Sequence, residues 1–98
     1  MTRWFRFYDD ALHDPKVQEL PAELFKTWVN LLSLCSKCDG VLPQTTNIAF
    51  TLRLRVDRVK TRLDYLVGCG LLDKTENGLK PHNWDGRQYK SDSSVTRV

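Results

Sequence analysis

The chain has 98 residues, of which 41% are hydrophobic and 28% are charged. This length fits one small domain and excludes the larger nucleotide-binding and barrel enzymes, whose cofactor crevices need more chain. No uncharged stretch approaches the roughly 20 apolar residues that cross a bilayer. Arg3, Arg6, Asp9 and Asp10 interrupt any signal-peptide core. We therefore expect a cytoplasmic binding module that is neither exported nor bound to a membrane.

The charges are distributed unevenly along the chain. Residues 1–49 hold five basic and six acidic side chains, whereas residues 50–98 hold ten basic and six acidic ones. Much of the basic excess lies within residues 53–62, and such a cluster attracts phosphate polyanions. A solvated helix face is the alternative interpretation. The odd number of cysteines, three, argues against a disulfide framework and for a reducing cytoplasm.

The first 37 residues predict an aromatic arm followed by two helices. Residues 4–8 are Trp-Phe-Arg-Phe-Tyr, a composition typical of a strand or a buried arm. Asp14 before Pro15 predicts an N-cap and the start of a short helix that ends near residue 20. Residues 22–37 predict a central helix, because their polar side chains form one narrow stripe and apolar side chains cover the rest. Part of that apolar arc could instead meet a second copy of the chain.

Residues 45–67 have the spacing of a helix-turn-helix. Thr45 or Thr46 is the expected N-cap of a first helix, and a second helix repeats apolar residues on one face after a tight turn. Two positions are unusual for this motif. Arg53 occupies a turn position where glycine is common, and Arg55 stands at the expected N-cap of the second helix.

The residues that follow predict a β-hairpin, or wing. The pair Asn77-Gly78 is favoured in two-residue turns, and Pro81 makes the second strand an edge strand. Val41 and Leu42 can supply a third strand. The predicted fold is therefore α+β and mostly helical, a winged helix-turn-helix with a small antiparallel β-sheet.

The expected domain covers residues 1–84, including the N-terminal aromatic arm. Trp84 is expected to fold back onto the core as its last anchor. Residues 85–98 are rich in Ser, Asp and Arg, which predicts a polar tail or linker.

The second helix of the motif turns a polar face outward. Each residue of an α-helix is rotated by roughly 100° about the axis from the one before it. With this rotation the apolar residues face the core, and residues 57, 58, 61, 62 and 65 lie on the other side. A helix of this width fits the major groove of DNA, where the arginines reach phosphates or guanine edges and the wing lysines hold the flanking backbone. The predicted DNA-binding residues are Arg53, Arg55, Arg58, Lys60, Thr61, Arg62, Tyr65, Lys74 and Lys80.

Several of these segments resemble the N-terminal domain of phage and prophage replisome organisers, which are DnaD-like replication initiation proteins. The resemblance covers roughly residues 4–84 and rests on aromatic and structural positions, which are residues 4–10, 14–20, Phe25, Trp28, Val29, Leu31, Leu32 and 40–43. It implies a winged helix in a bacterial host cell that binds duplex or single-stranded DNA near an origin, or assembles subunits. It also implies recruitment of primosome components or a helicase.

A zinc site is the main chemical alternative. Cys35 and Cys38 have zinc-knuckle spacing, and Cys69 with His82 could complete four ligands. There is no second Cys-x-x-Cys pair in the chain, so we expect no metal and no cofactor.

Catalysis is not expected either. The chain has no Gly-rich phosphate loop and no His-centred triad pattern. Trp4, Trp28 and Trp84 are expected in the core rather than in a ligand site. The remaining alternatives to DNA binding are a protein assembly module on the same scaffold, including a homo-oligomer, and a winged-helix transcriptional regulator.

Overall fold

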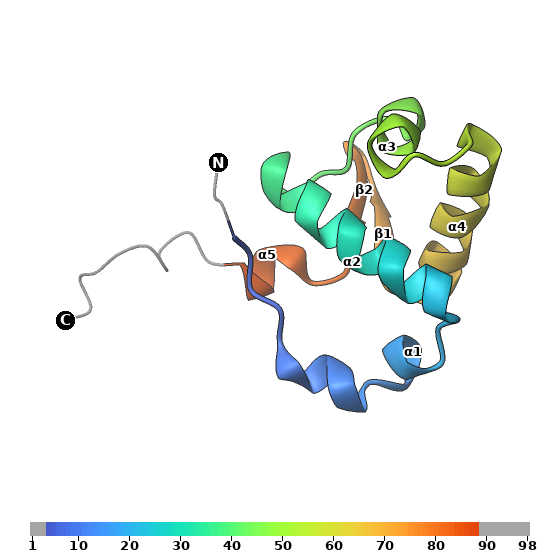
Figure 1. Cartoon of the computed structure of the whole chain (residues 1–98). Coiled ribbons are helices and arrows are strands. Elements are labelled where there is room, and N and C mark those ends of the chain that lie inside the picture. The colour runs from blue at the N-terminus through green and yellow to red at the C-terminus, as the bar shows by residue number, and fades with distance from the viewer. Residues whose placement is uncertain (1–3, 89–98) are drawn as a thin grey trace.

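The computed structural model describes residues 4–88. Its elements along the chain are η1 (Asp9–His13), α1 (Pro15–Gln18), α2 (Ala22–Lys37), α3 (Thr45–Leu52), α4 (Val56–Gly68), β1 (Leu72–Thr75), β2 (Gly78–Pro81) and α5 (Trp84–Arg87). The chain is mostly helical, and a small antiparallel sheet follows the main helices (Figure 1). This confirms the predicted α+β, winged-helix-like fold.

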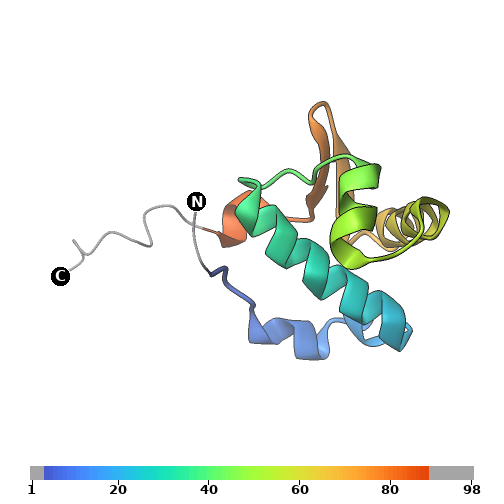
Figure 2. The same ribbon diagram turned by 45° about the horizontal axis from the view of Figure 1, so that its top comes forward.

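Helix α2 lies along the molecule, with α3, α4 and the hairpin on one side and the N-terminal segment with α1 on the other (Figure 2). The largest fully buried side chains come from these packed elements: Leu31 of α2, Ile48 of α3, Leu66 of α4 and Leu72 of β1. Apolar burial of this kind is the main force that holds a small domain together. The helix-turn-helix and the wing are therefore supported by one shared core.

The first two helices begin and end close to where the sequence predicts. The side chain of Asp14 accepts a hydrogen bond from the backbone N–H of Lys16 at 2.9 Å, so it caps α1 as expected. Helix α2 has the predicted bounds. The expected cap of α3 is wrong, because the N-cap is Gln44, whose side chain makes no capping hydrogen bond, and Thr45 is already helical.

The turn between α3 and α4 depends on an arginine in a left-handed conformation. Arg53 is the C-cap of α3 with φ 59° and ψ 46°, the region that glycine adopts most easily. The backbone N–H of Leu54 donates to the carbonyl of Ala49 at 3.0 Å and closes the turn. The sequence position where glycine was expected therefore has the backbone conformation that favours glycine.

The sheet differs from its prediction in two details. In residues 4–88 it has two strands, with Thr75 paired with Gly78. The two-residue turn is thus formed by residues 76 and 77, one position earlier than the predicted Asn-Gly pair. The predicted third strand is wrong: Leu42 donates one backbone hydrogen bond to Leu79 at 2.9 Å, and Pro43 follows with no N–H to continue a ladder.

The N-terminal arm is extended, is not a strand, and packs on the core through aromatic rings. Phe5 contacts Trp84 with ring centroids 6.3 Å apart, and Phe7 contacts Trp28 at 5.8 Å. Trp28 and Trp84 are buried as predicted. Trp4 is 57% exposed, so its predicted place in the core is wrong.

The folded part continues past the expected boundary at residue 84. Helix α5 runs from Trp84 to Arg87, and Gln88 then exchanges two hydrogen bonds with the backbone of Arg6 at 2.8 and 2.9 Å. Residues 85–88 are thus part of the domain. The rest of the expected tail, residues 89–98, lies outside the described residues.

Candidate nucleic-acid interface

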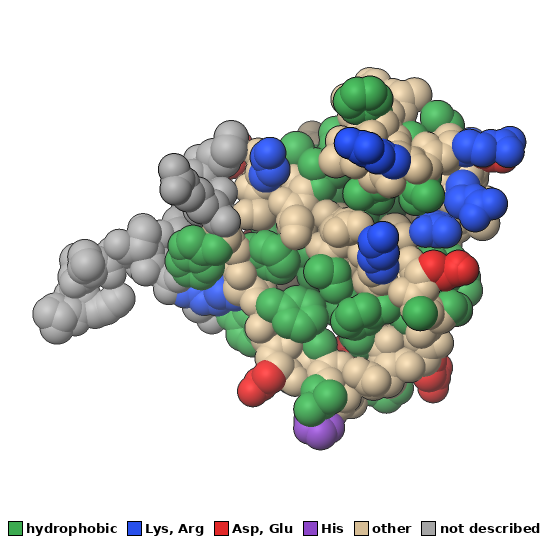
Figure 3. All heavy atoms as spheres, in the orientation of Figure 1, with side chains coloured by type: hydrophobic (Ala, Val, Ile, Leu, Met, Phe, Trp, Pro, Cys, Tyr) green, Lys and Arg blue, Asp and Glu red, His purple; other side chains and the backbone are tan. Residues whose placement is uncertain are grey.

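Helix α4 presents the predicted polar face. Val59, Leu63 and Leu66 are buried against the core, and seven of the nine predicted DNA-binding residues are exposed. The seven are Arg53, Arg55, Arg58, Lys60, Thr61, Tyr65 and Lys74. Figure 3 shows Lys and Arg side chains gathered at the upper right, over the end of α3 and over α4.

Four of these residues form a cationic surface, which we define as Arg53, Arg55, Arg58 and Lys60. All four side chains are exposed. Arg55 pairs with Asp57 at 3.3 Å, whereas Arg53, Arg58 and Lys60 form no ion pair with any residue in the range 4–88. Because their charges are not neutralised by neighbouring carboxylates, these groups can attract an anion from solution.

Asp57 is the acidic residue within this surface, and its position has a local cause. It lies in the first turn of α4, where its carboxylate accepts the backbone N–H of Arg58 at 3.0 Å. A carboxylate in this place offsets the unsatisfied N–H groups of the helix start. Asp57 therefore substitutes for the capping side chain that Arg55 does not provide.

Arg62 was predicted to face outward from α4 as a DNA contact, and this predicted orientation is wrong because its guanidinium contacts α2. Its Nη1 donates to the hydroxyl of Thr27 on α2 at 2.9 Å, and its Nη2 lies 3.9 Å from a carboxylate oxygen of Glu23. Its side chain is only 16% exposed. Residue 62 lies on the flank of α4 that meets α2, so the guanidinium reaches back into the molecule instead of outward.

Lys80 is also used internally. Its Nζ forms an ion pair and hydrogen bond with a carboxylate oxygen of Asp85 in α5. The prediction that Lys80 holds the DNA backbone is therefore not supported by its surroundings, since its charge is already compensated. Lys74 on β1 is the exposed lysine of the wing.

Thr61 and Tyr65 are exposed residues of α4 that follow Arg58 and Lys60 along the helix. The hydroxyl of Thr61 donates to the carbonyl of Asp57 at 3.1 Å, a hydrogen bond within the helix that leaves the lone pairs of the hydroxyl free. Tyr65 is 45% exposed, so part of its side chain is accessible from solution.

The cysteines do not form a metal site in the described residues. No group of three His, Cys, Asp or Glu side chains in residues 4–88 could hold a metal ion, and His82 is directed to Asp73 at 3.1 Å. Cys35 is fully buried, and burial, with a smaller contribution from Cys38, raises the pKa of its thiol to about 12. A neutral, inaccessible thiol is a poor metal ligand or nucleophile.

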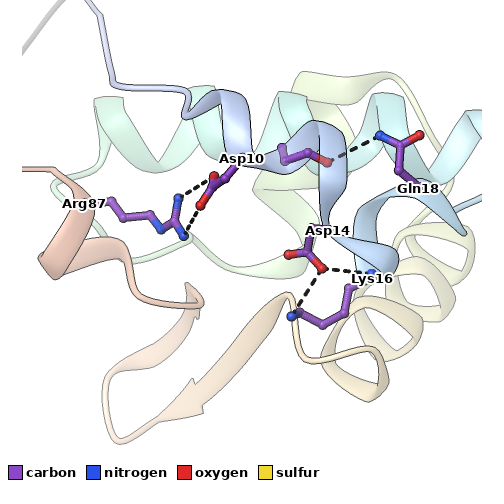
Figure 4. Close-up of polar contacts among 6 residues, drawn as sticks. Asp10, Asp14, Lys16, Gln18 and Arg87 are labelled. Carbon is purple, nitrogen blue, oxygen red and sulfur yellow. Dashed lines mark hydrogen bonds and ion pairs between the residues drawn. The ribbon is translucent and has the colours of Figure 1, made fainter.

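A second polar feature, which no sequence pattern indicated, is a cavity of about 300 Å³ between the N-terminal arm, α2 and α5. Asp10 and Arg87 point toward each other at its edge and form two hydrogen bonds of 3.1 Å (Figure 4). On the α1 side, Lys16 pairs with Asp14 at 3.4 Å. The hydrogen bonds from Arg87 lower the pKa of Asp10 from its ordinary value of 3.8.

Fold and site together define a winged-helix-like domain with a cationic helix-turn-helix. Comparison with protein families, with curated proteins and with solved structures finds no match to this chain. In residues 4–88, no helix has both the length and the apolar character that crossing a membrane requires. A proposal about function therefore depends on the site's own residues and on the sequence resemblance described above.

Proposed function

We propose that the protein binds DNA through the outward side of α4 and the α3–α4 turn, as a module of a phage-type replication initiation protein. The observation that supports DNA binding is the cationic surface, in which three of four basic side chains lack an acidic partner among residues 4–88. The role in replication is supported by the sequence resemblance to replisome organisers.

The cationic surface favours phosphate contacts as the main source of affinity. Arg53 and Arg55 lie at the turn, and Arg58 and Lys60 lie along the first turns of α4. Basic groups that neutralise phosphates release condensed counterions, so affinity depends steeply on salt. Thr61 and Tyr65, which lie further along the same helix, are then placed to contact sugars or base edges. Lys74 adds a flanking backbone contact from the wing.

The test is a salt series on Arg58→Ala. For duplex DNA, each lost phosphate contact reduces the slope of log K against log salt by about 0.9. We therefore expect the slope for Arg58→Ala to be shallower by about this amount than for the wild type, as measured by fluorescence anisotropy. The matched control is Lys37→Ala, which removes one exposed positive charge at the far end of α2 and should leave the slope unchanged. A wild-type affinity that does not depend on salt would contradict the proposal.

A second candidate function is protein assembly, favoured by an apolar surface that we define as Trp4, Phe7 and Phe25. All three are exposed aromatic residues. Figure 3 shows hydrophobic side chains gathered over α2 and the N-terminal segment, on the same side of the molecule as the cationic surface. Exposed aromatic clusters of this kind are typical of protein contacts.

A further inference from the structure

The most exposed large hydrophobic side chain in residues 4–88 is Phe50, at 88%. It lies on α3, where Ile48 and Ala49 are buried and Leu52 packs against the core. The helical period therefore turns Phe50 directly away from the interior. No core contact accounts for a phenylalanine at this position.

The surroundings of Phe50 are cationic or neutral. Helix α3 carries no charged residue, and Arg53 follows one turn later. A shallow hollow is lined by Ala49, Phe50, Thr51, Arg53 and Leu54. The nearest acidic residue along the chain is Asp57, whose charge is compensated by Arg55.

Arg53 lies near Phe50 on the surface, because both residues line the same shallow hollow. In its left-handed conformation Arg53 ends α3 and leads the chain into α4, its side chain is exposed, and it lines the same hollow as Phe50. An exposed aromatic side chain and an exposed cationic side chain that line one hollow fit one ligand chemistry in particular. The ring offers a face for a nucleobase and the guanidinium attracts the adjoining phosphate.

We propose that Phe50 and Arg53 bind an unpaired nucleobase and its phosphate, so that the protein prefers single-stranded or locally opened DNA to a closed duplex. This inference rests on the proposed DNA binding and names its substrate. The bases of a closed duplex are stacked on each other, so their faces are not accessible to Phe50. A protein partner fits this position less well, because Phe50 is followed by Arg53 and Arg55, whose exposed charges do not favour a dry apolar contact.

The experiment compares three probes of equal length: a single strand, the duplex with its complement, and an abasic strand that keeps the phosphates but lacks the bases. We expect the wild type to bind the single strand most tightly. Phe50→Ala should weaken binding of that strand by about 5- to 150-fold, the range for loss of one base–aromatic stack. Binding to the duplex and to the abasic strand should change less than about twofold.

Three variants separate stacking from other effects. Phe50→Leu keeps an apolar side chain but no ring, so it should lose affinity as Phe50→Ala does, whereas Phe50→Tyr should retain it. Leu12→Ala removes an exposed apolar side chain of η1, outside the cationic surface, and should have no effect. Because Phe50 is exposed, these variants should keep the wild-type circular dichroism spectrum and melting temperature.

The outcomes distinguish this inference from the proposed function. If Phe50→Ala binds the single strand like the wild type while Arg58→Ala still reduces the salt slope, DNA binding stands and the stacking site is wrong. Equal binding of the normal and abasic strands also overturns stacking. If no probe binds, both proposals fail. A change in molecular mass by light scattering on Phe50→Ala, without a change in strand affinity, would identify Phe50 as a protein contact and overturn the inference.

Discussion

Arg58 and Arg62 lie four residues apart on α4 but have different surroundings. The side chain of Arg58 is exposed, whereas Arg62 donates a hydrogen bond to the Thr27 hydroxyl and approaches Glu23. Hydrogen bonds from a charged donor contribute more to stability than those between neutral groups. Arg62 therefore joins α4 to α2.

Substituting Arg62 should accordingly affect stability and not DNA binding. We expect Arg62→Ala to lower the free energy of unfolding by about 1–2 kcal/mol, as measured by urea denaturation. The Thr27 hydroxyl would still donate to the carbonyl of Glu23 at 2.9 Å, which limits the loss. Because the Arg58 side chain is exposed, the free energy of unfolding of Arg58→Ala should stay within about 0.5 kcal/mol of the wild-type value. A reduced salt slope for Arg62→Ala at unchanged stability would restore Arg62 as a phosphate contact.

The partners of Arg62 and Lys80 could not be predicted from the sequence. Periodicity predicts that residue 62 lies off the buried stripe of α4, but it does not reveal that Thr27, a buried polar residue of another helix, lies within reach. The same holds for Lys80, whose partner Asp85 was expected in a tail. The exposed side chains of Arg58 and Lys60 were predictable, because helical spacing alone turns them outward.

At the scale of elements, the arm and α5 are joined by polar and aromatic contacts that include Asp10, Tyr8 and Arg87. Besides its two hydrogen bonds to Asp10, Arg87 places its guanidinium carbon 4.7 Å from the ring centroid of Tyr8. The Tyr8 hydroxyl donates to the carbonyl of Arg87 at 2.9 Å. Several independent contacts thus hold one short helix.

The pKa of Asp10 is a measure of its contact with Arg87. Its pKa in the folded protein lies below the ordinary value of 3.8, chiefly because Arg87 donates to its carboxylate. The stability from this pair is therefore present above about pH 4 and is lost as the pH falls through the lowered folded-state pKa. We expect NMR titration of Asp10 to give a pKa below 3.8 in the wild type and a higher one in Arg87→Gln. Equal values in both proteins would show that the pair is not populated in solution.

The elements that the sequence predicts well are those with a strong local signal. Asp14-Pro15 predicts the start of α1, and apolar periodicity predicts α2 and α4. The third strand was predicted wrongly because Pro43 has no N–H to continue a ladder. The start of the tail at residue 85 was predicted wrongly because long-range contacts hold residues 85–88. Helix α5 is only one turn long and is held by residues near the other end of the described chain.

At the scale of the whole molecule, the cationic and apolar surfaces are both visible in Figure 3. Phe25 packs on Trp28 with ring centroids 5.9 Å apart but keeps part of its ring exposed.

The assembly function predicts that the molecular mass measured by light scattering rises with protein concentration. This mass should not fall as salt is added, because apolar contacts are not screened. Phe25→Ser should then return the mass to that of one chain. A wild type that stays monomeric at all concentrations would remove this candidate.

The contact between the arm and α5 also bears on how the chain folds. Arg6 and Gln88 are 82 positions apart, and bringing such distant segments together costs loop entropy that only an otherwise ordered chain can recover. The hairpin and the α3–α4 turn close through much shorter separations. The arm should thus dock last during folding and detach first during partial unfolding, before the helix-turn-helix loses its core.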